Sequence, residues 1–86
     1  MGLVNQVFPR ETFLESVQKY AGDLASSVSP RSLRVIKRQV YDAIFQTLQE
    51  SFEQSEQDML ASLQSEDFKE GVAHFLQKRA PAFTGR

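Results

Sequence analysis

Hydrophobic residues recur every three or four positions along most of the chain, which is the spacing of one face of an α-helix. With its start and stop signals, this period predicts an all-α fold of three to four helices, at about residues 10–28, 30–46, 47–64 and 66–79. No Gly or Pro lies between Arg31 and Gln64, so the pattern leaves open whether the second and third helices are continuous. Residues 3–8 break the period before Pro9 and are predicted to be a short extended segment or edge strand.

Small polar residues mark the expected beginnings of the helices. Ser29 followed by Pro30 combines an N-cap serine with proline at the first helical position. Ser65 precedes two acids, which suit the positive end of a helix dipole. The spacing of a capping box, a Thr followed three residues later by Glu, occurs at residues 12–15 and 47–50. For the first helix, the other interpretation is a start nearer Pro9. These signals divide the chain into the predicted helices.

Composition narrows the classes of protein to which the chain can belong. Its 86 residues form one small domain at most, and the absence of Cys excludes disulfide scaffolds, Cys-ligated zinc, iron–sulfur clusters and thiol catalysis. A formal net charge of -1 argues against nucleic acid as a partner. No apolar run is long enough to span a membrane, and the first residues lack the features of a signal peptide. We therefore expect a cytoplasmic protein with no membrane partner.

Side chains that could carry catalysis are few, and none has the surroundings that catalysis needs. His74 is the only histidine, and we interpret it as a half-exposed surface residue rather than a catalytic base whose partner is missing. The carboxylates at positions 50, 53 and 56 recur along one flank among Gln and Ser residues, which favours a solvated acidic face over a catalytic pair. The residues alone therefore predict no catalytic side chain and no metal site.

Four cations between residues 31 and 38 form a basic cluster. Arg31, Arg34 and Arg38 share one helix face, as in the recognition helix of a helix-turn-helix protein. The negative net charge and the lack of a second basic patch instead favour a charged surface, or ion pairs with the acidic flank of the next segment.

Seven Phe and two Tyr are a large aromatic content for a chain of this size. Five of them lie on or beside the apolar stripes and are predicted to be mostly core: Phe13, Phe45, Phe52, Phe68 and Phe75. Phe8, Phe83 and Tyr41 are hard to bury as well, because so short a domain buries only about 60–65% of its unfolded surface. This surplus predicts an interface. We expect the isolated chain to form a dimer or higher oligomer, with Phe8 and the second or third helix at the contact.

Three stretches carry a more specific signal. Residues 2–9 read G-L-V-N-Q-V-F-P, and residues 66–83 read E-D-F-K-E-G-V-A-H-F-L-Q-K-R-A-P-A-F. Between them, Ser29-Pro30 precedes a helix that contains Lys37-Arg38. In this order they resemble three segments of the enoyl-CoA hydratase/isomerase (crotonase) family: G-L-V-N-x-V-x-P, S-P-x-x-x-x-x-x-K and the C-terminal E-D-x-x-E-G-x-x-A-F-x-x-K-R-x-P-x-F. The resemblance covers essentially the whole chain.

The resemblance implies that the chain is part of an enzyme. In that family, an upstream spiral of ββα units supplies the oxyanion hole and the acid/base carboxylates, and nothing here matches those motifs. Residues 1–86 are then a single C-terminal helical domain that closes over the acyl-CoA site and builds the trimer, without the catalytic spiral domain and inactive alone. The parent enzyme would add water to an acyl-CoA thioester or shift its double bond through a stabilised enolate. The CoA thioester is its substrate, and no covalently bound cofactor is implied.

One binding residue follows from the same resemblance. Lys78 is the Lys of the family's K-R pair, which can reach the phosphates of CoA, and the other interpretation is a cation at the end of a helix dipole. For the whole chain, the alternative is a free-standing helical protein-interaction module. The acyl chain and the choice between hydratase and isomerase stay open.

Overall fold

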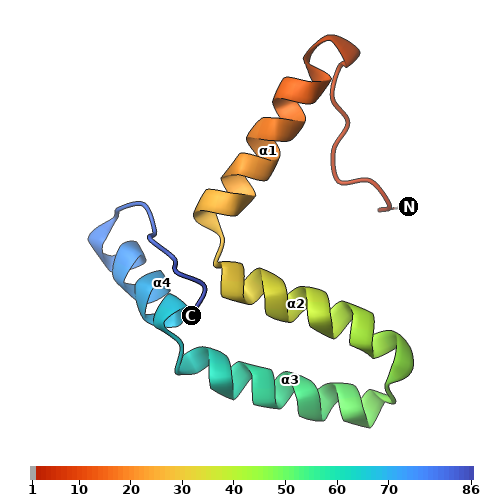
Figure 1. Cartoon of the computed structure of the whole chain (residues 1–86), viewed down its shortest axis with the longest axis vertical. Coiled ribbons are helices and arrows are strands. Elements are labelled where there is room, and N and C mark those ends of the chain that lie inside the picture. The colour runs from red at the N-terminus through yellow and green to blue at the C-terminus, as the bar shows by residue number, and fades with distance from the viewer. Residues whose placement is uncertain (1) are drawn as a thin grey trace.

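The computed structural model describes residues 2–86, and every regular element within them is helical. In chain order these elements are the 3-10 turn η1 (Arg10–Thr12), α1 (Phe13–Ser27), α2 (Pro30–Asp42), the 3-10 turn η2 (Ala43–Phe45), α3 (Leu48–Leu63) and α4 (Glu66–Gln77). The predicted all-α fold is confirmed. Residues 3–8 form no strand, and this segment runs back alongside α1 (Figure 1). Phe8 is half-buried and lines a small hollow together with Ser16 and Tyr20 of α1.

The second and third helices are separate. α2 and α3 lie side by side as a hairpin closed by η2, and α4 turns back from the end of α3 (Figure 1). Gln46 is extended, with φ -109° and ψ 150°, so the helical backbone is broken directly before Thr47. A strong start signal at Thr47 therefore divides a stretch that contains neither Gly nor Pro.

Three of the four predicted N-terminal caps are confirmed. The Ser29 and Ser65 hydroxyls accept hydrogen bonds from the N–H groups of Ser32 and Phe68, at 3.2 and 3.1 Å. Thr47 forms a complete capping box with Glu50. The capping box predicted at residues 12–15 is wrong, because Thr12 already lies inside η1 and its side chain makes no cap hydrogen bond. The first helical turn begins at Arg10, directly after Pro9, as the other interpretation expects.

The predicted ranges 30–46 and 66–79 run past the α-helices that form. After Asp42 the backbone tightens into η2, whose cap N–H at Gln46 bonds to Ala43 O. α4 ends at Gln77, because Lys78 adopts the left-handed conformation, with φ 52°. Lys78 and Arg79 therefore follow the last turn of α4 instead of forming it. No helix within residues 2–86 is long and apolar enough to cross a membrane.

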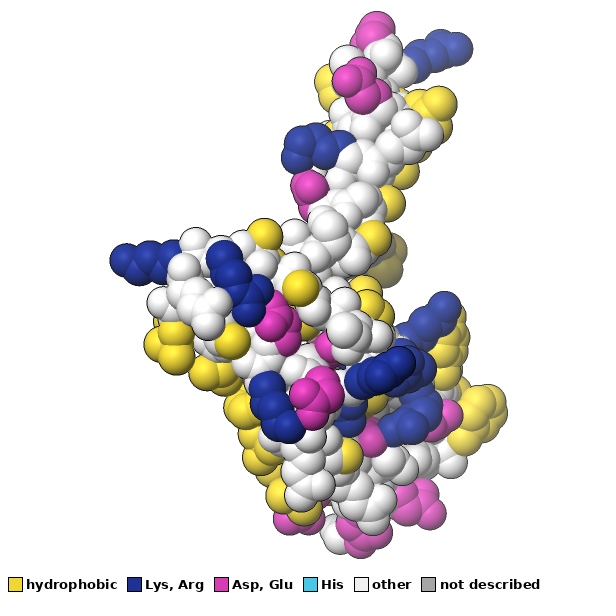
Figure 2. Space-filling view, turned by 60° about the vertical axis from the view of Figure 1, so that its left-hand side comes forward, with side chains coloured by type: hydrophobic (Ala, Val, Ile, Leu, Met, Phe, Trp, Pro, Cys, Tyr) yellow, Lys and Arg dark blue, Asp and Glu magenta, His cyan; other side chains and the backbone are white. Residues whose placement is uncertain are grey.

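The hydrophobic stripes of these helices remain open. No hydrophobic residue within residues 2–86 is buried, and the prediction that five Phe are mostly core is wrong, since their exposed fractions run from 44% at Phe68 to 89% at Phe45. The Cα radius of gyration is 16.2 Å, against about 12 Å for a compact chain of this length. α1 projects from the body formed by the other helices (Figure 1), and hydrophobic side chains lie on the surface of both parts (Figure 2). Each helix packs mainly on the element next to it in sequence. Its apolar side chains on the other sides therefore stay exposed within residues 2–86.

The capping box at Thr47 gives a test of local stability. Thr47→Ala removes the oxygen that accepts from Glu50 N at 3.2 Å, and is expected to lower the free energy of unfolding of the full-length protein by about 1 kcal/mol. Thr12→Ala is the matched control, because Thr12 caps nothing. Urea unfolding of both variants measures the difference, and equal losses would contradict the assignment.

Candidate functional site

The buried residues within positions 2–86 are polar, and two of them are carboxylates that hold the helices together. Asp58 of α3 is 8% exposed and forms an ion pair with Arg38 of α2. Gln39 Nε2 donates to the second oxygen of Asp58 at 2.9 Å. Burial opposes ionisation of Asp58, but the hydrogen bonds from Arg38, Gln39 and Gln54 outweigh it and hold its pKa below the usual value. Asp58 thus joins α2 to α3.

The basic cluster of α2 contacts the rest of the chain. Besides the pairing of Arg38 with Asp58, Arg31 Nη1 donates to Ser62 Oγ at 2.6 Å, and Arg34 Nη2 donates to the carbonyl of Gly85 at 3.2 Å. The ion-pair interpretation holds only for Arg38, and its partner Asp58 lies outside the acidic face at residues 50, 53 and 56. Arg31 and Arg34 instead bond to a hydroxyl and a carbonyl. The acidic face at residues 50, 53 and 56 is exposed, as predicted, and Glu50 serves in the capping box.

Asp67 of α4 is the more deeply buried carboxylate, at 5% exposed. Ser29 Oγ, which also caps α2, donates to Asp67 Oδ2 at 2.5 Å. The N–H groups of Thr84 and Gly85 donate to Asp67 Oδ1 at 2.8 and 3.1 Å. Burial raises the pKa of Asp67, but the hydrogen bonds from Ser29, Thr84 and Gly85 reverse this and lower it below the usual value. One carboxylate therefore joins three segments far apart in sequence: the start of α2, the start of α4 and the C-terminal tail.

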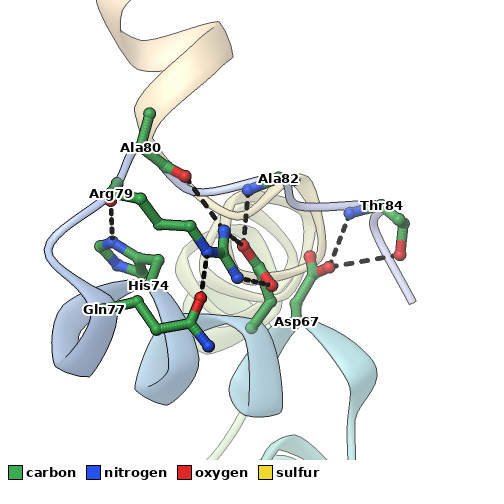
Figure 3. Close-up of polar contacts among 8 residues, drawn as sticks. Asp67, His74, Gln77, Arg79, Ala80, Ala82 and Thr84 are labelled. Atoms are coloured by element: carbon green, nitrogen blue, oxygen red, sulfur yellow. Dashed lines mark hydrogen bonds and ion pairs between the residues drawn. The ribbon is translucent and has the colours of Figure 1, made fainter.

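Glu70, one turn further along α4, holds the tail at a second point. Arg79 forms a two-pronged ion pair with the Glu70 carboxylate, with Nη2 to Oε2 at 2.9 Å. Ala82 N donates to Glu70 Oε1 at 2.8 Å. Figure 3 shows these bonds converging above α4, with the Arg79 carbonyl 3.2 Å from His74 Nδ1. The Arg79 and Ala82 donors lower the pKa of Glu70 to about 2.

A groove of about 570 Å³ lies between the α1–α2 junction and α4, within the size range of small-molecule sites. The Phe83 ring forms part of one wall and lies 3.9 Å from where a Cβ of Gly71 would be. Phe83 also meets His74 edge to face, with ring centroids 5.9 Å apart. On the α4 side, the other lining residues include the apolar side chains of Phe68, Val72, Phe75 and Leu76. On the α2 side, they include the polar side chains of Ser29, Arg31 and Ser32.

Lys78, the predicted CoA-binding residue, lies beyond the end of α4 and does not line this groove. Its side chain is exposed, and its ammonium makes no hydrogen bond or ion pair within residues 2–86. His74 is half-buried, and its Nδ1 lies within hydrogen-bond distance of the carbonyl that follows the helix. Among the described residues, no three or more His, Cys, Asp or Glu side chains gather into a metal-binding cluster.

The structural roles of Asp67 and Glu70 do not follow from the local sequence pattern. The pattern indicates Asp67 only as an acid at the helix dipole, because no local feature shows that residues 84–85 return to it. The signal was present in the E-D-x-x-E-G and K-R-x-P-x-F stretches, which the structure joins to each other. Within residues 66–83, Glu70 thus pairs with Arg79, and Phe83 lies against Gly71. The side chain of Lys78 forms no such contact in the described residues.

Comparison with known proteins now identifies the fold. The sequence model of the protein family described as enoyl-CoA hydratase/isomerase matches residues 1–86. The chain belongs to the enoyl-CoA hydratase/isomerase family. It is 36% identical over 85 residues to 2,3-dehydroadipyl-CoA hydratase of Escherichia coli (strain K12), an alignment that covers 99% of this chain and 33% of that enzyme. It is 33% identical to 1,2-epoxyphenylacetyl-CoA isomerase of the same organism, with 99% and 32% covered.

Solved structures of the family have the same helix arrangement. A probable enoyl-CoA hydratase/isomerase from Mycobacterium abscessus superposes with a TM-score of 0.88 at 30% identity, over 99% of this chain and 34% of that one. An enoyl-CoA hydratase subunit I from Geobacillus kaustophilus gives 0.78 at 39% identity, over 99% and 33%. The chain therefore spans about a third of the length of the family members it matches. The family predicted from the three sequence stretches is confirmed.

Acid should release the tail from Glu70. A carboxylate whose folded pKa is lowered contributes stability above its unfolded pKa, and that contribution is lost as pH falls towards the folded value. For Glu70 the window runs from about 4.5 down to about 2. The Ala82 amide proton, which bonds to Glu70, is expected to shift in NMR spectra of the full-length protein with a midpoint well below 4.5. Arg79 is the cation paired with Glu70, and His74 is the other titratable side chain that faces it. Glu70→Gln should abolish the transition, and a midpoint near 4.5 would show that the pair does not form.

Proposed function

We propose that this chain is the C-terminal oligomerisation and CoA-site-closing domain of an enoyl-CoA hydratase/isomerase-type enzyme that acts on acyl-CoA thioesters. The observation that carries the proposal is a family match over the whole chain combined with helices that bury no hydrophobic residue within residues 2–86. Helices whose apolar faces are exposed to water need other protein segments to cover those faces. Because the chain spans only about a third of its relatives, an upstream catalytic domain and neighbouring subunits are the expected sources of that cover.

Two observations support the C-terminal placement. The stretch 66–83 resembles the family's C-terminal motif, and its residues Asp67, Glu70, Gly71, Arg79 and Phe83 form one set of mutual contacts with the tail. The resemblance also implies ββα units upstream, whereas residues 2–86 contain no strand. Both observations are consistent with a helical segment that follows a strand-rich domain in the parent chain.

The coding DNA on both sides of this chain tests the placement. A C-terminal domain requires an open frame upstream of the Met1 codon that encodes roughly twice the length of this chain, because 99% of the chain matches 33% of its relative. That frame should have the strand and helix periods of ββα units. An open frame of this length running downstream would instead place the chain at the start of the enzyme. Stop codons on both sides would support the free-standing interaction module.

The chain alone is expected to be catalytically silent. No residue within it matches the family's oxyanion-hole or acid/base positions, so crotonyl-CoA should be hydrated at the buffer rate in its presence. The decrease in thioester absorbance measures turnover, and the full-length enzyme serves as the positive control. Activity that follows the 86-residue protein through gel filtration would overturn the assignment of catalysis to another segment.

Lys78 is the residue we propose as a contact to the CoA phosphates. Its exposed ammonium has no partner within residues 2–86, whereas the neighbouring Arg79 forms an ion pair with Glu70. An ammonium on a flexible stem suits phosphate as a point charge. For the whole enzyme, we propose a trimer-type assembly.

A further inference from the structure

Residues 80–86, here called the C-terminal strap, connect elements that scarcely contact each other directly. On one side the strap bonds to α4, through Ala82 N to Glu70 and through Thr84 N and Gly85 N to Asp67. On the other side it reaches α2, where Arg34 donates to the Gly85 carbonyl at 3.2 Å. α2 packs on α3 and α3 on α4, so the strap closes these three helices into a ring. Figure 1 shows the C-terminal end lying between α4 and the start of α2.

The strap also depends on one backbone conformation. Gly85 has φ +81°, a region that side chains with a Cβ rarely adopt, and a Cβ there would lie 3.6 Å from Pro30 Cβ. The left-handed backbone at Gly85 directs its N–H to Asp67 while its carbonyl faces Arg34. Glycine at this position therefore lets the backbone of a single residue contact both helices.

Asp67 joins the strap to the junction between α1 and α2. Its Oδ2 accepts from Ser29 Oγ at 2.5 Å and from Gly85 N at 3.1 Å, so the strap and the N-cap of α2 share one carboxylate oxygen. Ser29 is 8% exposed and Asp67 is 5% exposed. When the strap leaves, water reaches Asp67 and competes with Ser29 for it, which weakens the bond that fixes Ser29.

We propose that the C-terminal strap is a clasp whose docking fixes the α1–α2 junction through Asp67, so that release of the strap loosens the start of α2 and frees α1 to move. The strap also carries Phe83, which forms part of the groove wall. Release of the clasp therefore widens the groove at the same time. α1 has no extensive packing on α3 or α4, so this junction controls the direction in which α1 projects.

Hydrogen exchange in the full-length protein tests the coupling. Thr84→Pro removes the N–H that donates to Asp67 at 2.8 Å and leaves Ser29 and Asp67 unchanged. The Gly85 amide should then exchange about tenfold faster or more, because a hydrogen bond to a charged group is lost. The clasp predicts a rise of at least about threefold at the Ser32 amide too, which bonds to Ser29 Oγ and lies outside the strap. Gly85→Ala should have the same two effects through its strained backbone.

Two further variants complete the test. Coupling between two sites is reciprocal, so Ser29→Ala should speed exchange at Thr84 and Gly85. Asp58→Asn is the control, because Asp58 joins α2 to α3 without touching the strap. In the Asp58→Asn variant, the amides of Thr84 and Gly85 should exchange as in the wild type. Faster exchange in the strap with Ser32 unchanged in both strap variants would overturn the proposal, as would strap amides that Thr84→Pro leaves unaffected.

Discussion

On dilution from micromolar to nanomolar concentration, the isolated 86-residue chain is expected to lose its helical circular dichroism and its oligomeric state together. None of its hydrophobic side chains within residues 2–86 is buried, and its α-helices have only 12 to 16 residues. Isolated helices of this length are marginal in water. Each large side chain that an interface covers contributes roughly 1.5–3 kcal/mol, so association of copies supplies most of the stabilisation available to this chain.

Sedimentation velocity across the dilution series measures the oligomer, and circular dichroism on the same samples measures the helices. Phe45→Ser removes the most exposed Phe, at 89%, and should shift both transitions to higher concentration. Gln57→Ser, a polar exposed change on α3, is the control. Phe8 was predicted at the contact, but it is half-buried against α1, which makes Phe45 the better probe. A 9.8 kDa monomer that unfolds cooperatively would show that the helices need no partner.

Replacing Lys78 with Ala in the full-length enzyme is expected to raise KM for its acyl-CoA substrate about five- to thirtyfold. This range corresponds to the loss of one charge contact to phosphate, about 1–2 kcal/mol. kcat should change little, because a contact far from the reacting atoms binds the ground state and the transition state equally. Steady-state kinetics at several substrate concentrations separates the two constants.

Lys78→Gly is the matched variant that separates charge from backbone. Lys78 has φ 52°, where a residue with a Cβ is strained relative to glycine. Lys78→Gly should therefore stabilise the protein by about 1 kcal/mol, while losing the same ammonium. If Lys78 binds CoA, Ala and Gly raise KM alike. If Lys78 only ends the helix, KM is unchanged in both variants, and the two differ only in free energy of unfolding.

Local hydrogen bonds explain why much of the helical pattern was predictable. The caps at Ser29, Thr47 and Ser65 each act on an N–H three residues away, so a short window of sequence contains both partners. The hydrophobic period is equally local. The predicted cap at Thr12 does not form, because the 3-10 turn that follows Pro9 already includes Thr12.

The sequence by itself determined the helical class, three helix starts and the family. Only the tertiary structure decided which of these residues meet. Ser29 and Asp67 are 38 positions apart and Arg38 and Asp58 are 20 apart, and such pairs form only when the helices take their final directions. The exposure of the apolar stripes also depends on how the segments are arranged in space. A helical period shows that one face is apolar, but whether that face is covered depends on neighbouring segments, and within residues 2–86 each helix has too few of them to bury it.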